Sequence, residues 1–458
     1  MKIAILSSAS AGGAGIAAYR IYEAFKEHSE IKADFFDIDA FMETVDQKIS
    51  PQISATNQRY TNTHFTIDYA TEVREWVIDL FSDYDLINIH WASYLVSISE
   101  ILKLAEKGLK ILFTLHDFYY LTGGCHYPAG CTGYYDRCIN CPQLNSLNET
   151  FTDVLKNKRI KQKLFGHKNV FLSAPSKFIV QNAVHSKTIP AERAFVLRNS
   201  YQSITSFQSK DISFRSILLI ADSFNEKRKG LQLAVDSLKL ASVEYQKKQS
   251  SLPLILHLLG GVEQEIVDQL DDYPIKIIKH GHVKEHYKLV EVFQNCHYIL
   301  TCSYEDNWPN VLVESGCYGC LPIVGKWHGC EEFGKVFKVT DFIAESYTPI
   351  HFSNAILNAL ITDDTSLLSK NKVHAKEVRK VHEPKKVVEN YLKVVNENSK
   401  CQFEDYKKAT SVNYLFDDRK EYNVKSSPFG IQDISKYRKN HTEGVSNYQY
   451  GLINLYSN

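Results

Sequence analysis

Short, continuous apolar runs are the feature that most constrains the fold of this chain. They are rich in Ile, Leu and Val and occur first before residue 200, as KIAILSS, DLINIHW, KILFTLH, VFLSAPS and AFVLRNS. The series starts again near residue 216, with SILLIAD, LILHLLGG, IKIIKHGHV, HYILTCS and LPIVGK. Continuous runs are typical of strands that are buried on both faces of a parallel sheet. Helix-like segments such as KGLQLAVDSLKLASVEY separate the runs, so we predict an α/β fold.

The two series predict two Rossmann-like, doubly wound parallel-sheet domains rather than one large sheet. A chain of 458 residues has room for two or three domains of about 150 residues each. We place the first domain at residues 1–205, the second at 206–382 and a C-terminal helix at 383–398. Residues 399–458 are polar, and we expect a surface appendage or a partly disordered extension without an assigned role.

Charge and composition argue against several classes of protein. The 53 Lys and Arg residues balance 53 Asp and Glu residues, so there is no field to attract nucleic acid. No stretch approaches the roughly 18 apolar residues of a membrane span, and the apolar stretch in MKIAILSSASAGGAG is too short for a signal peptide. We expect a soluble, cytoplasmic protein whose ten cysteines are mostly free or bound to metal.

The stretch SYEDNWPNVLVES, residues 303–315, holds the most informative candidate site. Asp306 falls in the loop expected after the strand HYILTCS, and Glu314 falls in the first two turns of the next helix. At that place Glu314 can accept two hydrogen bonds from a ribose diol, while Asp306 can hold a neighbouring hydroxyl-bearing group. Backbone N–H groups near Asn310 and Val311, at the positive end of the helix, would face a phosphate.

Two carboxylates could also hydrolyse a glycoside, one as acid and the other as nucleophile or base. The basic segment EKRKG at residues 226–230 favours a nucleotide site instead. Arg228 and Lys229 follow the strand SILLIAD in a loop before a helix, where they are suited to neutralise a diphosphate. Basic loop residues are usually only solvated, but this strand–loop–helix setting matches phosphate binding.

Eight segments occur in an order that resembles the retaining GT-B glycosyltransferases of glycosyltransferase family 4. They are GGAGIAAYRI, DLINIHW, TLHDFYYLTGGCHY, CINCPQL, APSKF, KRKGLQLAVDSL, GHV and EDNWPNVLVESGCYGCLPIVG. The likeness is strongest to the branch that builds bacterial exopolysaccharides and colanic-acid-type polymers. It implies two Rossmann-like domains facing each other across a cleft. It also implies metal-independent hexose transfer, with retention, from a nucleotide diphosphate sugar to a hydroxyl of a glycan or lipid-linked glycan in cell-surface polysaccharide biosynthesis.

The resemblance also implies roles for single residues. Lys229, together with Arg228, matches the basic residues that stabilise the departing diphosphate. Asp306 matches the first acid of the family's pair, which contacts the transferred sugar. The family usually has Glu at that position, and Glu305 lies just before it, so either carboxylate can be the acid that faces the sugar.

Donor binding is implied for three further elements. Glu314 matches the acid that holds the nucleotide ribose, and Gly12 and Gly13 match a loop that lets the backbone come close to substrate. These glycines do not fit G-x-G-x-x-G, so we expect no nicotinamide site. His116 matches a histidine that faces the donor sugar; the alternative is a strand-end histidine satisfied by its neighbour Asp117.

Four cysteines lie in the insertion at residues 123–144, GGCHYPAGCTGYYDRCINCPQL. They are Cys125, Cys131, Cys138 and Cys141. The final C-x-x-C pair is typical of a zinc knuckle, and four thiolates would close a tetrahedral structural site. The first gap is wider than usual for zinc, so reduced, unliganded thiols are the main alternative. Disulfides are the third, disfavoured by the reducing compartment that we expect. Catalysis needs no metal in either case.

The segment KNKRIKQKLFGHK, residues 156–168, has six Lys or Arg residues and no acid. We expect an ordinary solvated helix face; the alternative is peripheral contact with an anionic membrane at its inner, cytoplasmic face, where a lipid-linked acceptor is delivered.

Two other functions compete with glycosyl transfer. One is a catalytically silent protein that binds nucleotide sugar or glycan within a polysaccharide assembly complex. The other, an epimerase or hydrolase, needs an acid–base pair that TLHDF does not reveal.

Overall fold

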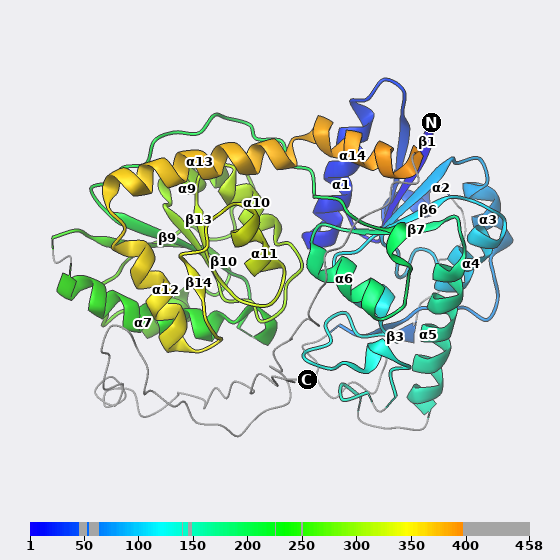
Figure 1. The fold of residues 1–458 in the computed structure, drawn as a ribbon, viewed down its shortest axis with the longest axis horizontal. Helices are drawn as coiled ribbons and strands as arrows, with labels where there is room; N and C mark the ends of the chain where they lie inside the picture. Colours follow the sequence, from blue (N-terminus) through cyan, green and yellow to red (C-terminus); the bar gives the residue numbers. More distant parts are fainter. Residues whose placement is uncertain are drawn as a thin grey trace. The chain divides into compact units, whose positions relative to one another are not determined.

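The computed structural model describes most of the chain (Figure 1): residues 1–44, 53–54, 64–139, 141–144, 149–224, 226–248 and 251–396. It divides into two compact units. The first contains Met1–Gln202, Asn307–Asn310 and the chain from Val381 through the last described helix, and the second contains Ser203–Asp306 and Val311–Lys380. The polar tail predicted at residues 399–458 lies outside the described residues.

The first unit is built on a six-stranded parallel sheet with the order β2-β1-β5-β6-β7-β8. Its strands are β1 (Lys2–Ser7), β2 (Lys32–Phe36), β5 (Leu86–Trp91), β6 (Ile111–Thr114), β7 (Val170–Ala174) and β8 (Ala194–Val196). The five strands predicted for this half are therefore confirmed. The prediction missed β2, because this edge strand, KADFF, is only partly buried and lacks a continuous apolar run.

Helices cover both faces of the first sheet. They are α1 (Gly12–Lys26), α2 (Ile38–Thr44), α3 (Glu75–Phe81), α4 (Ile98–Glu106), α5 (Glu149–Gly166), α6 (Lys177–His185) and α14 (Pro384–Asn396). Short 3-10 turns η1 (Tyr119–Leu121), η2 (Gly133–Tyr135) and η3 (Ala191–Arg193) and the antiparallel pair β3 (Ile53–Ser54) and β4 (Thr66–Ile67) complete this unit. Alternate residues of β1 enter opposite cores, Ala4 on one face and Ile3 on the other.

The last described helix, α14, packs against α1 in the first unit (Figure 1). Tyr391 meets Phe25 of α1 edge to face, with ring centroids 5.8 Å apart. Val387 and Val388 join the same buried cluster. The chain therefore returns to its first unit after completing the second.

The second unit carries another six-stranded parallel sheet, with the order β11-β10-β9-β12-β13-β14. Its strands are β9 (Arg215–Ala221), β10 (Leu254–Gly260), β11 (Lys276–Lys279), β12 (Tyr298–Thr301), β13 (Leu321–Gly325) and β14 (Ile343–Ala344). In chain order this is 3-2-1-4-5-6, the Rossmann arrangement. All five predicted strands are present. β14 has two residues, too few to make an apolar run.

The second sheet is likewise wrapped by helices, listed here in chain order. They are η4 (Lys227–Lys229), α7 (Leu231–Lys248), α8 (Glu263–Leu270), α9 (His286–Asn295), α10 (Asn310–Gly316), α11 (Gly329–Val336), α12 (Pro349–Leu360) and α13 (Asp364–His382). The predicted α/β class with two Rossmann-like parallel sheets is confirmed. Among the helices described, none is both long and apolar enough to cross a membrane.

Candidate functional site

Three predicted catalytic residues meet at the carboxyl edge of the second sheet. Arg228 and Lys229 lie in η4, directly after β9, and Asp306 lies in the loop after β12. Nζ of Lys229 is 2.9 Å from Oδ2 of Asp306, and Nη1 of Arg228 is 3.3 Å from the same oxygen. Arg228 Nη1 also donates to the Glu305 carbonyl oxygen at 3.0 Å. The basic loop and the acidic loop therefore form one cluster.

A glycine lets the two loops approach so closely. Gly230 has a φ of +64°, and a Cβ at this position would lie 2.2 Å from the carbonyl oxygen of Cys302. The backbone N–H of Tyr304 donates to the carbonyl oxygen of Arg228 at 2.8 Å. Only glycine tolerates both the left-handed backbone and this contact. The final residue of KRKG is thus what brings the cations to Asp306.

The charges in this cluster balance one another. Burial acts to raise the pKa of Asp306, but Lys229 and Arg228 outweigh it, so its pKa is lowered from the usual value and the carboxylate stays ionised. Arg228 also forms an ion pair with Glu226. Lys229 is the more accessible cation, because 39% of its side chain is exposed against 11% for Arg228.

The two neighbouring acids are more deeply placed. Glu305 is 3% exposed, and Glu314, on α10, is 8% exposed. The side chain of Asp306 keeps 13% exposure. Of the two consecutive carboxylates weighed as the sugar-facing acid, Glu305 is thus buried, whereas Asp306 is partly exposed and bonded to the basic loop.

Asn310, at the start of α10, groups with the first unit. Its Nδ2 donates to the carbonyl oxygen of Gly13 at 2.9 Å, and its Oδ1 accepts from Nδ2 of Asn199 at 2.9 Å. Two predicted donor-binding residues, Asn310 and Gly13, are therefore in direct contact.

The glycines at the start of α1 differ in what they require. Gly12 has a φ of +72°, which favours glycine, but a Cβ on Gly12 or Gly13 would meet nothing within 4 Å. The crowded position is Gly15, where a Cβ would lie 2.3 Å from the carbonyl oxygen of Ala9. Sequence reasoning did not single out Gly15, although GGAG contains it.

His116 follows β6 in the first unit, and its partner is another histidine. Its Nε2 lies 2.8 Å from Nδ1 of His90 on β5, and the two rings stack with centroids 5.0 Å apart. Burial lowers the pKa of His116 to about 4. The alternative in which Asp117 satisfies this histidine is therefore wrong, because Asp117 bonds elsewhere.

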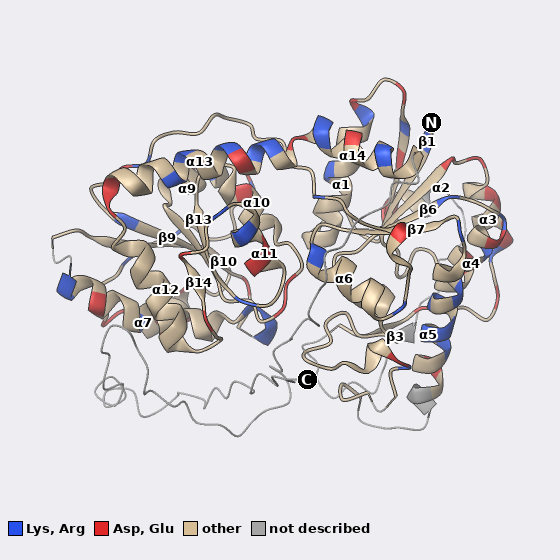
Figure 2. Ribbon diagram, viewed as in Figure 1, with Lys and Arg blue, Asp and Glu red and all other residues tan. Residues whose placement is uncertain are grey.

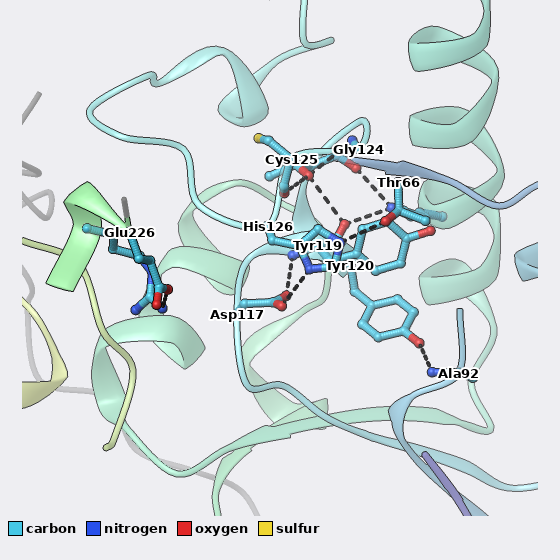
Figure 3. A network of polar contacts seen from close by, with 12 residues as sticks. Thr66, Ala92, Asp117, Tyr119, Tyr120, Gly124, Cys125, His126 and Glu226 are labelled. Carbon is cyan, nitrogen blue, oxygen red and sulfur yellow. Dashed lines mark hydrogen bonds and ion pairs between the residues drawn. The ribbon is translucent and has the colours of Figure 1, made fainter. Parts of the chain in front are cut away.

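Asp117 bonds to His126, as Figure 3 shows. Its Oδ2 is 2.7 Å from Nδ1 of His126, and its Oδ1 accepts from the backbone N–H of Tyr119 at 2.8 Å. Nε2 of His126 lies 3.0 Å from the hydroxyl of Thr66. This Thr–His–Asp order resembles a nucleophile triad, but Thr66 is 4% and His126 2% exposed, so neither is presented to a substrate. Sequence reasoning missed this pair, whose partners sit at the two ends of a loop.

Two lysines of α5 correct the expectation of an ordinary solvated face. Lys161 is fully buried, and its Nζ donates to the carbonyl oxygen of Tyr119 at 2.7 Å. Lys158, 2% exposed, donates to the carbonyl oxygen of Leu121. Burial lowers the pKa of Lys161 to about 8, although the neighbouring carboxylate of Asp68 opposes it. These lysines support the η1 turn that follows His116, while the other basic residues of α5 are exposed. Figure 2 marks the Lys and Arg positions along α5 in blue.

None of the four cysteines of the insertion forms a disulfide. Sγ of Cys138 accepts from the backbone N–H of Gly123 at 3.2 Å, and Sγ of Cys131 accepts from that of Gly133 at 3.4 Å. Burial raises the pKa of Cys141 to about 12. Within the described ranges, no three His, Cys, Asp or Glu side chains are arranged to hold a metal ion, so the thiols as they lie here do not form a closed zinc site.

Part of the chain is similar in sequence to a curated glycosyl transferase. No family model matches the chain. The chain is 22% identical over 247 residues to the "Putative colanic acid biosynthesis glycosyl transferase WcaC" of Escherichia coli (strain K12). That alignment covers 51% of this chain and 57% of the relative, so the chain matches little more than half of the relative's length.

Similar solved structures extend over most of the chain. One is the lipopolysaccharide outer core galactosyltransferase WaaB in its apo form, with 12% identity and a TM-score of 0.54 over 87% of this chain and 100% of that one. Another is a glycosyltransferase from Rickettsia africae ESF-5, with 12% identity and a TM-score of 0.55 over 87% and 99%. A third is sucrose-phosphate synthase from Thermosynechococcus elongatus, with 13% identity and a TM-score of 0.54 over 87% of this chain and 98% of that one. The chain therefore has the GT-B fold.

Proposed function

We propose that this chain is a retaining glycosyltransferase, independent of metal, that acts in cell-surface polysaccharide biosynthesis. It moves a hexose from a nucleotide diphosphate sugar to a hydroxyl of a glycan or lipid-linked glycan. The observation that carries the proposal is the cluster of Arg228, Lys229 and Asp306 at the carboxyl edge of the second sheet. Ligands of open α/β sheets bind outside this edge. The GT-B fold and the name of the E. coli relative support the same class of reaction.

The cluster is suited to a diphosphate. An ammonium has three N–H donors, and the described contacts of Lys229 use one of them on Asp306. The partly exposed Lys229 side chain can turn its other donors to a phosphate oxygen. Glu314, in the helix that follows Asp306, would accept the ribose diol, and Asp306 would contact the transferred sugar.

In the reaction, the bond between the anomeric carbon and the diphosphate oxygen breaks, and a new bond forms to the acceptor oxygen. The electron pair of the broken bond stays on the diphosphate, where Lys229 and Arg228 stabilise the developing charge. The acceptor's proton passes to the departing phosphate oxygen, so the scheme requires no protein nucleophile and no protein base.

A panel of UDP-, GDP- and ADP-sugars tests the proposal. Thermal shift and release of nucleoside diphosphate are measured together for the wild type, Lys229→Ala and Glu314→Ala. Lys227→Ala is the matched control, because Lys227 is an exposed lysine of the same turn. We expect one donor to give both signals, with loss in the two site variants and retention in the control. A panel without any thermal shift would refute the nucleotide-sugar site.

One observation favours a catalytically silent nucleotide-sugar or glycan-binding protein as the second candidate. Both cations of the cluster already face carboxylates, so a bound diphosphate must compete with Asp306. Thermal shift without release of nucleoside diphosphate, even with added glycans, would favour this candidate.

Peripheral membrane contact is a separate part of the proposal. Two of the six basic residues of this segment, Lys158 and Lys161, are buried. The other four, Lys156, Arg159, Lys163 and Lys168, are exposed. Each exposed cation near an anionic surface contributes about 1 kcal/mol. We expect weak, salt-sensitive co-sedimentation with vesicles that contain phosphatidylglycerol, and none with phosphatidylcholine alone.

A further inference from the structure

Three polar side chains form a hydrogen-bonded chain that runs from β5 to the end of β6 and ends at His116. Asn88 and His90 lie on β5, and both are buried, with exposures of 0% and 3%. His116, directly after the neighbouring strand β6, is half-buried. Such a chain has few arrangements in which every hydrogen bond joins a donor to an acceptor.

The first link is anchored by a backbone carbonyl. One end of the Asn88 amide lies 3.0 Å from the carbonyl oxygen of Leu112 and 2.9 Å from the hydroxyl of Thr114. A carbonyl oxygen can only accept, so this end of the amide must be the NH₂ group. The other end, Oδ1, lies 3.0 Å from Nε2 of His90. Because Oδ1 can only accept, Nε2 of His90 must carry a proton.

The second link is the hydrogen bond between His90 and His116, and the proton on Nε2 of His90 fixes its direction. Burial lowers the pKa of His90 well below its usual value, so its ring is neutral and holds a single proton. With that proton on Nε2, Nδ1 of His90 is an acceptor, and the hydrogen on this bond must come from Nε2 of His116. The pKa of His116 is about 4, so this ring is neutral too, and its Nδ1 keeps a lone pair.

The lone pair of Nδ1 is the free end of the chain. Among the described residues, the bond to His90 is the hydrogen bond that the His116 ring makes. The charged group nearest in sequence, Asp117, is engaged with His126 and the backbone of Tyr119. His116 therefore offers a hydrogen-bond acceptor at the carboxyl edge of the sheet, where ligands bind.

We propose that Asn88 and His90 are positioning residues that hold His116 in its Nε2–H tautomer, so that Nδ1 accepts a hydrogen bond from a sugar hydroxyl at the carboxyl edge of the first sheet. The sugar contact rests on the proposed function, whereas the tautomer does not. The arrangement selects a ligand that donates at this point, so a sugar whose facing hydroxyl is replaced by hydrogen would lose the bond.

The tautomer is measured on the full chain by long-range ¹⁵N–¹H correlation of the histidine rings at pH 7. His90→Gln and His116→Gln serve only to assign the two sets of signals. We expect both rings to be neutral, each with its proton on Nε2. A charged ring at either position, or a proton on Nδ1 of His116, would overturn the proposal without any variant.

Asn88→Leu tests the anchor. Without the amide, the hydrogen bond between the rings can run in either direction, so signals of an Nδ1–H tautomer of His116 should appear. Ser173→Ala is the matched control, because it removes a buried hydroxyl that bonds to Thr114 but lies outside the chain. The control should keep a single tautomer. A single, unchanged tautomer in Asn88→Leu would show that Asn88 and His90 do not set it.

The sugar contact is tested with the same signals. A donor from the panel should move the Nδ1 resonance of His116, whereas UDP, GDP or ADP alone should not. In Asn88→Leu we expect kcat/KM for that donor to fall roughly 5- to 10-fold, as for the loss of one neutral hydrogen bond. Donor binding that leaves Nδ1 unmoved would overturn the contact. If no donor binds, the contact fails with the proposed function, while the tautomer result stands separately.

Discussion

The carboxyl edges of the two sheets are built from opposite kinds of chemistry. At the second sheet, Arg228, Lys229 and Asp306 form an ion-paired cluster that reaches solvent. At the first sheet, His90 and His116 are neutral rings joined by one hydrogen bond. Both edges sit on parallel sheets of the same size. The same architecture therefore carries a charged site and an uncharged one.

This difference indicates a division of labour. A cluster of ionised groups is suited to a ligand that is itself charged, such as a diphosphate. A pair of neutral rings is suited to a ligand that presents hydroxyl groups, because its donors and acceptors match without a net charge. We therefore expect charge-removing changes to affect the two edges unequally.

The largest effect is expected at the charged edge. Arg228→Ala should lower the turnover of the donor found in the panel by roughly 10²- to 10³-fold, because the leaving group loses a fixed cation. Arg228→Lys should cause a smaller loss of turnover than Arg228→Ala. Lysine keeps the charge but lacks the planar fork, in which Nη1 donates to Asp306 and to the carbonyl oxygen of Glu305 and Nη2 donates to Glu226. Steady-state release of nucleoside diphosphate measures both. If Lys227→Ala caused an equal loss, the specific role of Arg228 would be refuted.

The next effect concerns the support of the neutral edge. Lys161→Met should lower the free energy of unfolding by about 3 kcal/mol, because the carbonyl oxygen of Tyr119 loses its donor and the buried Asp68 loses a facing cation. Lys163→Met, on the same helix, is the control. Lys163 is exposed and pairs with Glu106, so its loss should cost about 0.5 kcal/mol. Urea unfolding separates the two, and equal effects would contradict the supporting role of Lys161.

Two glycines, Gly230 in the second unit and Gly12 in the first, should differ in how much stability an added Cβ costs. Gly230→Ala should cost about 2 kcal/mol and reduce donor turnover, because its Cβ would collide with the carbonyl oxygen of Cys302 and displace the basic loop. Gly12→Ala should cost only about 1 kcal/mol, because the space beside Gly12 is open and only the left-handed backbone is strained. Thermal unfolding and activity are measured on both variants. A larger loss in Gly12→Ala would reverse this ranking.

As the pH falls, the protonation of His116 at the first sheet should destabilise the fold before the ion pairs of Asp306 are lost. The pKa of His116 is lowered from 6.5 to about 4, so between these values the unfolded chain binds more protons than the folded one. The contribution of neutral His116 to the free energy of unfolding is complete above pH 6.5, and it is lost as the pH falls toward 4. The upper limit is about 1.4 kcal/mol for each unit of pKa difference. The lowered pKa of Asp306 places the loss of its ion pairs below pH 3.8.

Urea unfolding between pH 7 and pH 4 measures this dependence. His116→Gln should show a shallower decline than the wild type, because one titrating group is removed. Parallel curves would mean that His116 does not contribute to acid sensitivity.

The smallest effect is expected from chelation. The proposed reaction uses no metal, so EDTA should leave donor turnover within about twofold of the untreated protein, a change of less than 0.5 kcal/mol. Metal analysis of the purified chain decides separately between structural zinc and free thiols at Cys125, Cys131, Cys138 and Cys141. Loss of turnover that Mg²⁺ or Mn²⁺ restores would contradict a metal-independent reaction.

The strands were predictable because their signal is local. Ten apolar runs predicted ten of the twelve strands in the two parallel sheets, since a strand buried on both faces must be apolar along its length. β2 and β14 escaped because one is a partly buried edge strand and the other has two residues. The meeting of Asp306 with Lys229 was also foreseeable in outline, because both follow strands whose carboxyl ends share an edge.

The partners of buried polar groups were not predictable in the same way. The alternative to a sugar-facing role had Asp117 satisfy His116, but the hydrogen-bond partner of His116 is His90, 26 residues away. Asp117 bonds instead to His126 across a loop. Lys161 looked like part of a solvated basic face. Which polar groups pair in an interior depends on packing between elements distant in sequence, and apolar periodicity does not encode that packing.

The sequence by itself determined the two-sheet α/β architecture and the loops that carry Arg228, Lys229 and Asp306, because burial of apolar runs and the conformational freedom of Gly230 act over a few residues. Only the tertiary structure decided the partners of His90 and His116 and the inward course of Lys161. A buried donor must find an acceptor wherever the fold places one, and that choice is made by the whole packed unit rather than by neighbours in the chain.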